Sequence, residues 1–459
     1  MATALNHIIR KAVVDFQFNG NTDGIALRNE VKDWFDEFSG RLEQVLNGVS
    51  GNGEVISINE LRLEIGLFGT DWKQQASHKL LEQLNDRLRL IKTGIVSSSG
   101  YVVKQPGQHF AEVFLYFLQH GNLPWQSSVS TSYPWIGSME ELMNNADSDF
   151  VVQLINMLSR SATAKERFIK NIPFQSAITL FTKSNILSLK QQRIAKDFQL
   201  VLDNISGNKN SGANQPLFSI FLQAITHGFN ENQLQQALIQ LEQTNLPASK
   251  DAVKVLRGLS SMKDILNGEK DELMKGPYKN LKEIKQPAPG PIPEEGIYLS
   301  NAGLVIIAAM IPALFQKTGL VDNDNNIRDI DRAVCFINYL ATGKEQMEEF
   351  ELALPKILSG VDIDTVIDTK GFSIDDTLEK ESTEMLSAVI EHWSILKNTS
   401  IAGLRESFLI RNGKLSFDGN DWLLQAEPQS YDMLLQHLPW NFTMIKFSWM
   451  KQLLKTEWI

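Results

Sequence analysis

Prolines at positions 287, 289, 291 and 293 alternate with other residues in the run QPAPGPIPEE. Because proline has no amide hydrogen and a fixed φ, this run can continue neither a helix nor a sheet ladder. Such a run favours extended polyproline geometry and acts as a semi-rigid spacer. Charged residues fill the stretch just before it. We therefore predict a linker over residues 268–295, with folded regions on both sides.

The region before residue 138 contains short alternating stretches. Alternation of apolar and polar residues predicts strands over residues 14–18 and 61–67, and residues 101–103 form a third candidate strand. Apolar residues spaced by three and four predict helices with one buried face. These helices are expected over residues 27–46, 73–92 and 110–119. Residues 1–138 are therefore predicted to form a small α+β domain.

Helical spacing dominates the next region, residues 139–267. A polar, Gly/Asn-rich tract over residues 206–215 predicts a loop between two helical groups in this middle domain. Residues 296–459 follow the linker and form a C-terminal domain of apolar helices with minor strand content. The expected fold class is thus α+β and predominantly helical.

The composition excludes several classes of function. Lys and Arg number 44 and Asp and Glu 54, so the net charge is 44 − 54 = -10. Nucleic-acid binding needs a basic patch that displaces counterions from phosphates, so we expect no nucleic-acid partner. The single cysteine excludes an intrachain disulfide and a cysteine zinc cluster, and indicates a reducing, cytoplasmic compartment.

The opening residues mix charge into every turn, so we expect no export signal. The longest apolar run, over residues 303–314, contains Pro312. It is shorter than the roughly 20 residues that a membrane span needs. The run therefore predicts a buried core helix and no membrane span.

Candidate catalytic and metal sites are weak throughout. An acidic tract from Asp322 to Ile327 has oxygen ligands at alternate positions, but a calcium loop needs glycine at its sixth position and glutamate at its twelfth. Those positions hold Ile327 and Ala333, so a solvated turn is the better interpretation. Cys335 lies in an apolar run and is interpreted as a buried, inert thiol. We expect no catalytic residue, no cofactor-binding residue and no metal ligand.

The chain contains three tryptophans that directly follow a proline, in the runs LPW and YPW and in a second LPW near the end. Proline fixes the backbone, and tryptophan supplies a large area to bury. These residues are interpreted as packing anchors within domains. The alternative is that some are interface anchors, because tryptophan is enriched at binding hot spots.

The C-terminal region contains an ordered set of phrases. They are EEGIYLSNAGLVIIAAMIPALFQKTGL, RAVCFINYLATG, LALPKILSG, VIEHWSILKNTSIAGLRESFLIRNGKL, WLLQAEP and LPWNFTMIKFSWM. In this order they resemble the contractile injection system tape measure family of phage-tail-like particles. The opening phrases HIIRKAVVDFQF, LRLEIG and FLYFLQHGNLPW are similar to the beginning of that family as well.

The resemblance implies a non-enzymatic assembly component, without a cofactor, that helps to set tube and sheath length. It implies tube, baseplate or cap proteins as partners, and a location in the cytoplasm during assembly or within the assembled particle. The motif positions that it carries over have structural or interface roles. They are Asn301, Ala302, Gly303, Leu304, Arg332, Ala333, Glu391, His392, Trp393, Arg405, Phe408, Leu438, Pro439 and Trp440.

The alternative is a baseplate or tube-end adaptor, or an assembly chaperone, that acts by binding proteins through its surface. A long uninterrupted helix within residues 139–267 would separate the two, because a stretched ruler needs it and an adaptor does not. The sequence lacks the sustained heptads that such a helix would favour.

Overall fold

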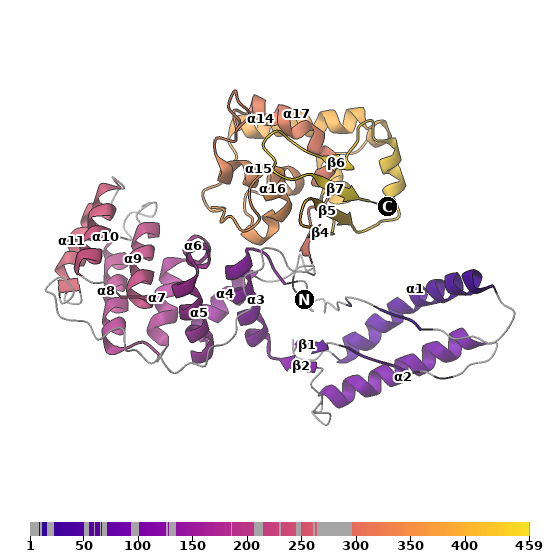
Figure 1. Cartoon of the computed structure of the whole chain (residues 1–459), viewed down its shortest axis with the longest axis horizontal. Coiled ribbons are helices and arrows are strands. Elements are labelled where there is room, and N and C mark those ends of the chain that lie inside the picture. Colours follow the sequence, from indigo (N-terminus) through magenta and orange to yellow (C-terminus); the bar gives the residue numbers. More distant parts are fainter. Residues whose placement is uncertain are drawn as a thin grey trace. The chain divides into compact units, whose positions relative to one another are not determined.

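The computed structural model contains two compact units, residues 1–110 and residues 111–459 (Figure 1). It describes residues 9, 12–15, 23–49, 55–58, 60–64, 66, 71–92, 101–124, 127, 135–184, 186–205, 214–228, 231–244, 249–259, 262–263 and 296–458. These residues are mostly helical, with a small five-stranded mixed sheet near the C-terminus. The predominantly helical fold class is thereby confirmed. The predicted linker over residues 268–295 lies outside the described residues.

The first unit contains two long helices, α1 (Gly24–Val49) and α2 (Trp72–Lys92). Their shared apolar face includes Trp34, whose indole Nε1–H donates to Ser77 Oγ over 2.8 Å. Strand β1 (Val55–Ile58) pairs antiparallel with β2 (Tyr101–Lys104). The helices predicted over residues 27–46 and 73–92, and the third candidate strand, are confirmed.

Two predicted strands in this unit are not found where they were expected. Residues 12–15 and 60–64 carry no strand, and the remaining positions of the two stretches are outside the described residues, apart from Gly66, which is also not in a strand. A strand forms just before the stretch predicted over residues 61–67, at β1, where pairing with β2 satisfies its backbone N–H and C=O groups. Alternation alone selects a pattern of side chains, whereas a strand also needs a partner for its N–H and C=O groups.

The second unit begins with a series of short helices that we call the helical array, residues 111–258. Ser161 ends one helix and starts the next, because its Oγ accepts the N–H of Ala164. Phenylalanines at positions 168, 174, 198, 218 and 221 pack ring against ring inside the array. The helices are α3 (Pro106–His120, whose last ten residues belong to this unit), α4 (Trp135–Asn145), α5 (Ser148–Arg160), α6 (Ala162–Asn171), α7 (Phe174–Lys183), α8 (Leu189–Ile205), α9 (Asn214–Thr226), α10 (Glu231–Gln243) and α11 (Ser249–Gly258).

Among the described residues of the middle region, helices run for 10 to 17 residues. No long uninterrupted helix is present in that described part. Helix α8 ends at Ile205 and α9 begins at Asn214, so the last two positions of the loop predicted over residues 206–215 are helical. Residues 206–213 lie outside the described residues. The helical character predicted for this region is confirmed.

The C-terminal domain, residues 296–458, folds around the mixed sheet, in the order β3-β4-β5-β7-β6. Strands β5 and β7 are parallel, and the other neighbours are antiparallel. Buried residues alternate along β4, β5 and β7, so one face of the sheet packs on the core. The strands are β3 (Ile297–Leu299), β4 (Gly413–Phe417), β5 (Trp422–Ala426), β6 (Met444–Ile445) and β7 (Leu454–Glu457).

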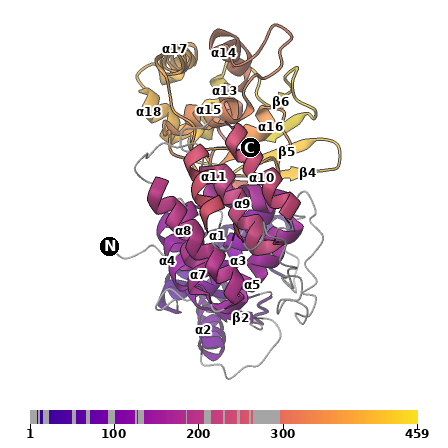
Figure 2. The same ribbon diagram turned by 90° about the vertical axis from the view of Figure 1, so that its left-hand side faces the viewer.

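Helices supply the rest of this core, and α14 and α17 lie side by side in both views (Figures 1 and 2). The helices are α13 (Leu304–Ile307), α14 (Ile311–Lys317), α15 (Ile330–Thr342), α16 (Ala353–Leu358), α17 (Asp376–His392) and α18 (Ile401–Leu404). Short helical turns lie between these helices: η3 (Ala308–Met310), η4 (Glu349–Leu352) and η5 (Ser394–Leu396). The π-helical turn η6 (Arg405–Leu409) follows α18, and η7 (Asp432–His437) lies between β5 and β6.

The apolar run over residues 303–314 is largely buried, as predicted, with Ala309 and Ala313 exposed, but it is not one helix. It divides into α13, the turn η3 and α14, with Pro312 in the first turn of α14. Proline at this position cannot donate to the carbonyl one turn earlier, so the helix restarts there. Within the described residues, no helix is long and apolar enough to cross a membrane.

Several tryptophans near the C-terminus donate a hydrogen bond to another part of the C-terminal domain. Trp393 is fully buried and donates to Leu434 O, while the half-buried Trp440 donates to Ile306 O over 2.7 Å. Trp458 donates to Asp432 Oδ2. These contacts fit the packing interpretation better than the interface alternative, because a buried indole N–H needs a partner.

We expect Gly303→Ala to destabilise the C-terminal domain by about 1 to 3 kcal/mol. A Cβ on Gly303 would lie 1.8 Å from Phe408 O, so the backbone of the π-helical turn would have to move. Gly371→Ala is the matched control, since its nearest neighbour lies at 3.9 Å. Thermal unfolding monitored by circular dichroism measures both variants, and equal melting temperatures would show that the two backbones are not in close contact.

Candidate functional site

The candidate site is a buried polar cluster where helix α6 meets the C-terminal domain. Ala164, Arg167, Phe168 and Asn171 are buried on one face of α6, at the spacing of a single helical stripe. The alanine and the phenylalanine suit an ordinary core, and the amide of Asn171 donates to Arg167 O and Glu349 Oε2. The arginine does not, because a buried guanidinium requires partners for its N–H groups.

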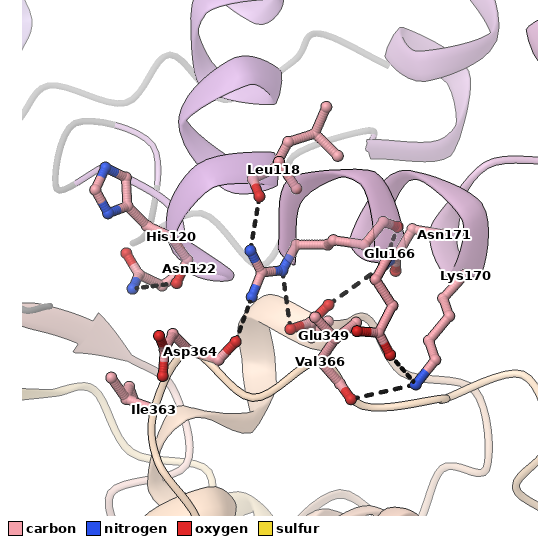
Figure 3. Close-up of polar contacts among 12 residues, drawn as sticks. Leu118, His120, Asn122, Glu166, Lys170, Asn171, Glu349, Ile363, Asp364 and Val366 are labelled. Carbon is pink, nitrogen blue, oxygen red and sulfur yellow. Dashed lines mark hydrogen bonds and ion pairs between the residues drawn. The ribbon is translucent and has the colours of Figure 1, made fainter. Parts of the chain in front are cut away.

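Arg167 is fully buried, and its guanidinium donates in three directions (Figure 3). Nε donates to Glu349 Oε1 over 3.0 Å. Nη1 donates to the carbonyl oxygen of Leu118, at the end of α3, over 2.6 Å, and Nη2 donates to Asp364 O over 2.9 Å. One side chain therefore joins α6 to α3 and to two separate segments of the C-terminal domain.

Glu349 receives hydrogen bonds from both sides of this junction. Besides Arg167, Lys356 Nζ donates to Oε1 over 3.0 Å and Asn171 Nδ2 donates to Oε2 over 3.3 Å. Lys356 is also buried, and it donates to Ile363 O over 3.1 Å. The carboxylate is therefore the common acceptor of two buried cations.

The turn that carries Glu349 is held in place by its neighbours. In η4, the side chain of Glu348 accepts the backbone N–H of Glu351, and the side chain of Glu351 accepts the backbone N–H of Glu348. Such a reciprocal capping box satisfies N–H groups at the start of a helical turn. It fixes the direction in which Glu349 projects.

Burial shifts the acid–base equilibria around the junction. The pKa of Lys356 is lowered, chiefly by burial, although the Glu349 carboxylate opposes this shift. The pKa of His120 is lowered by burial and by the charge of Arg167, so its imidazole is neutral at pH 7. Burial, with a smaller contribution from Glu351, raises the pKa of Glu348 to about 7.

A rim of weaker contacts surrounds the buried cluster. Lys170 Nζ donates to Val366 O and also pairs with Glu166 (Figure 3), and Lys370 Nζ donates to Asn171 O over 2.9 Å. The ring of Phe350 packs edge-on against Phe117 and Trp135, with centroids 6.0 and 5.0 Å apart. The junction is thus a mixture of ion pairs, hydrogen bonds to carbonyls and one aromatic contact.

This arrangement is built to hold segments together. The cluster contains no nucleophile beside a base, and in the part of the chain that the structure describes there is no group of three His, Cys, Asp or Glu side chains that could hold a metal. Cys335 is buried, and burial raises its pKa to about 12, as expected for an inert thiol. Asp322 accepts the N–H groups of Asp324 and Asn326, which is the predicted solvated turn.

The predicted family-motif positions lie elsewhere in the C-terminal domain. Half of them are buried in its core. Arg405 donates to Leu340 O, and Arg332 pairs with Asp375. The buried positions are Asn301, Ala302, Gly303, Leu304, Ala333, Trp393 and Phe408, the half-buried ones include Arg405, Leu438 and Trp440, and the exposed ones include Glu391, His392 and Pro439. Their roles remain a prediction.

One motif residue is linked to the junction indirectly. Asn301 Nδ2 donates to Asn338 Oδ1 and to Glu351 O, two residues beyond Glu349. Arg167, Glu349 and Lys356 are not among the residues predicted from the sequence. The sequence does place two of these charged residues at positions expected to be buried. Arg167 falls on the apolar stripe of its helix, and Lys356 interrupts the apolar run LALPKILSG.

We expect Glu349→Gln to lower the free energy of unfolding by about 3 kcal/mol, because it leaves Arg167 and Lys356 buried without a carboxylate. Replacing all three charged residues together, as Arg167→Met, Glu349→Leu and Lys356→Met, should recover most of this loss. Lys451→Met is the control, since its pair with Asp362 is exposed and worth under about 1 kcal/mol. Urea unfolding gives the free energy of unfolding of every variant. A triple variant less stable than Glu349→Gln would show that the unpaired buried charges are not the cause of the loss.

The raised pKa of Glu348 predicts a pH dependence of stability. Its ordinary pKa is 4.5 and its value in the fold is about 7, so between these values the folded chain binds more protons than the unfolded chain. Stability from this group is therefore complete below about pH 4.5 and is lost as the pH rises through about 7. Glu348→Gln should flatten the fall in melting temperature between pH 5 and 8, and a slope identical to that of the parent protein would refute this assignment.

Comparison with known proteins places the chain in a family. No curated protein sequence and no solved structure gives a significant match. The sequence profile of one family, described as contractile injection system tape measure protein, matches residues 6–458. The match extends over nearly all of the 459 residues and includes both the C-terminal domain and the helical array. The chain therefore belongs to the contractile injection system tape measure protein family.

Proposed function

We propose that this tape measure protein acts on tube length as a folded body that docks on other particle proteins, and not as a stretched ruler. Membership of the family gives it a structural, non-enzymatic role in setting tube length. The proposal concerns how that role is performed. In this proposal the chain sets tube length by binding other particle proteins through its surface, as an adaptor would.

The observation that carries the proposal is the packing of the helical array. Its longest described helix, α8, has 17 residues and spans about 26 Å at roughly 1.5 Å per residue. The helices bury their apolar faces against one another, including the rings of Phe168, Phe198 and Phe221. Stretching the array would expose these rings, at a cost of about 1.5 to 3 kcal/mol for each one.

The junction supports the same mechanism. Pulling α6 away as an extended strand would break the hydrogen bonds of Arg167 to Glu349, Leu118 O and Asp364 O. It would also remove the hydrogen bond that Asn171 Nδ2 donates to Glu349. A chain selected to be drawn out inside a tube has no need for this arrangement.

Tube, baseplate or cap proteins are the partners that we propose, with binding taking place in the cytoplasm during assembly and persisting in the particle. The exposed motif positions Glu391, His392 and Pro439 are the proposed contacts, since no core packing accounts for them. The buried motif positions are proposed to maintain the domain that presents them.

We further propose that the chain is organised as the sequence predicted: an α+β domain over residues 1–138, a helical domain over 139–267, a linker over 268–295 and the family-signature domain over 296–459. The five-stranded sheet and the core of the C-terminal domain support independent folding of the last of these.

Inserting a soluble helical block of about 20 residues between α8 and α9 distinguishes the two mechanisms. If the chain is a folded body, sheath length in electron micrographs stays constant. If it is a stretched ruler, each added residue lengthens the particle by roughly 1.5 Å, about 30 Å in total. A shift proportional to the size of the insert would overturn the proposal.

The same block inserted into the exposed β4–β5 turn, at Gly419, is the matched control. It adds the same mass to the chain but lies outside the region that a ruler would stretch. Particle yield with this control measures how much an insertion disturbs assembly without any effect on length.

A further inference from the structure

We propose that the junction is a reversible latch, through which the helical array and the C-terminal domain separate and rejoin as two folded bodies. Arg167 is the residue that closes it. The inference does not depend on the proposed function, because it concerns the purified chain and is tested without particles.

The hydrophobic cores support separation. In the described residues, the two core clusters of the C-terminal domain contain only residues from 297 onward. The array has a core of its own, in which Phe168, Phe174 and Phe218 pack together. Opening the junction therefore leaves both cores in place.

The contacts that cross the junction are mainly polar. Among the described residues, they include the ion pair of Arg167 with Glu349 and hydrogen bonds that end on the carbonyl oxygens of Asp364, Val366 and Asn171. Asn171 Nδ2 also donates to Glu349 Oε2, and Gln215 Nε2 donates to Asp368 Oδ2. Phe350, against Phe117 and Trp135, adds an aromatic contact. Water can replace each of these hydrogen bonds, so the net stabilisation from each is small.

Charge balance further lowers the cost of opening. Two cations, Arg167 and Lys356, share the single carboxylate of Glu349, and all three side chains are at most 1% exposed. Desolvation of such groups opposes docking even when they are paired. Release returns Arg167 to water and leaves Lys356 with Glu349 as a one-to-one pair on the C-terminal domain. The released state therefore has a better charge balance than the docked state.

The helical array itself holds Arg167 in position. Gly121, at the end of α3, has a positive φ, and a Cβ there would lie 2.7 Å from the guanidinium of Arg167. Together with the carbonyl oxygen of Leu118, this glycine forms a cradle on the array's side of the junction, from which Nε and Nη2 of Arg167 reach Glu349 and Asp364 O. The closed state therefore has a defined position for the guanidinium, while hydration favours the open state.

Single-molecule energy transfer on the full chain tests the latch. Cysteines introduced as Gln236→Cys on α10 and Thr383→Cys on α17 are exposed and accept the two dyes, while the native Cys335 is buried. We expect a major population at one transfer efficiency and a minor one at lower efficiency. Arg167→Gln should raise the ratio of the low to the high population at least about tenfold, since it removes the ion pair but little volume.

Three further measurements make the test decisive. Lys370→Met, at the rim, should move the ratio in the same direction by less, and Lys451→Met should leave it unchanged. Helical circular dichroism should be the same in all variants. Loss of helical signal in step with the change in energy transfer, or a single efficiency that no junction variant shifts, would overturn the latch.

Discussion

A guanidinium removed from water must have its N–H groups satisfied, and this requirement organises the second unit of the chain. Arg167 finds acceptors in α3, in η4 and in the segment around Asp364, which are far apart in sequence. None of these segments could shift by a helical turn without leaving an N–H unpaired in a dry environment. The capping box around Glu349, the conformation of Gly121 and the position of α6 are therefore mutually dependent.

Local pattern was sufficient for much of the fold. The helices α2, α3 and those of the array follow from spacing, because a single apolar stripe on a short helix needs only some core to face. Strands were less predictable. The sequence showed an alternating stretch near residue 63, but the ladder formed at β1, since pairing with β2 depends on a partner that periodicity does not reveal. The apolar run over residues 303–314 is predicted to be one helix, although Pro312 already indicates the restart of the chain at α14.

The candidate site was less accessible still. Arg167 and Glu349 are 182 residues apart, and an isolated arginine or glutamate in a sequence has the appearance of a solvated residue. Arg167 is marked only by its position on the apolar stripe of α6, and this indication is weak until the boundaries of the helix are known. Resemblance to the family pointed to residues such as Trp393 and Gly303, which maintain the core of the C-terminal domain, and away from the junction that joins this domain to the array.

A folded tape measure raises the question of where length information resides. The radius of a compact body grows only as about the 0.38 power of its residue number, so adding about 20 residues to the 349-residue second unit (459 − 111 + 1) enlarges it by about 0.4 Å. The same residues drawn out as a helix would add about 30 Å. The contour length of a folded chain therefore has almost no effect on its overall size. Its binding surfaces, and whether its domains are docked, can still affect its partners. If the chain acts as a folded body, tube length depends on which partners it binds and on when it releases them. The junction between the helical array and the C-terminal domain is stabilised by hydrogen bonds that water can replace. Opening it would change the surfaces that the chain presents to partners without unfolding either core.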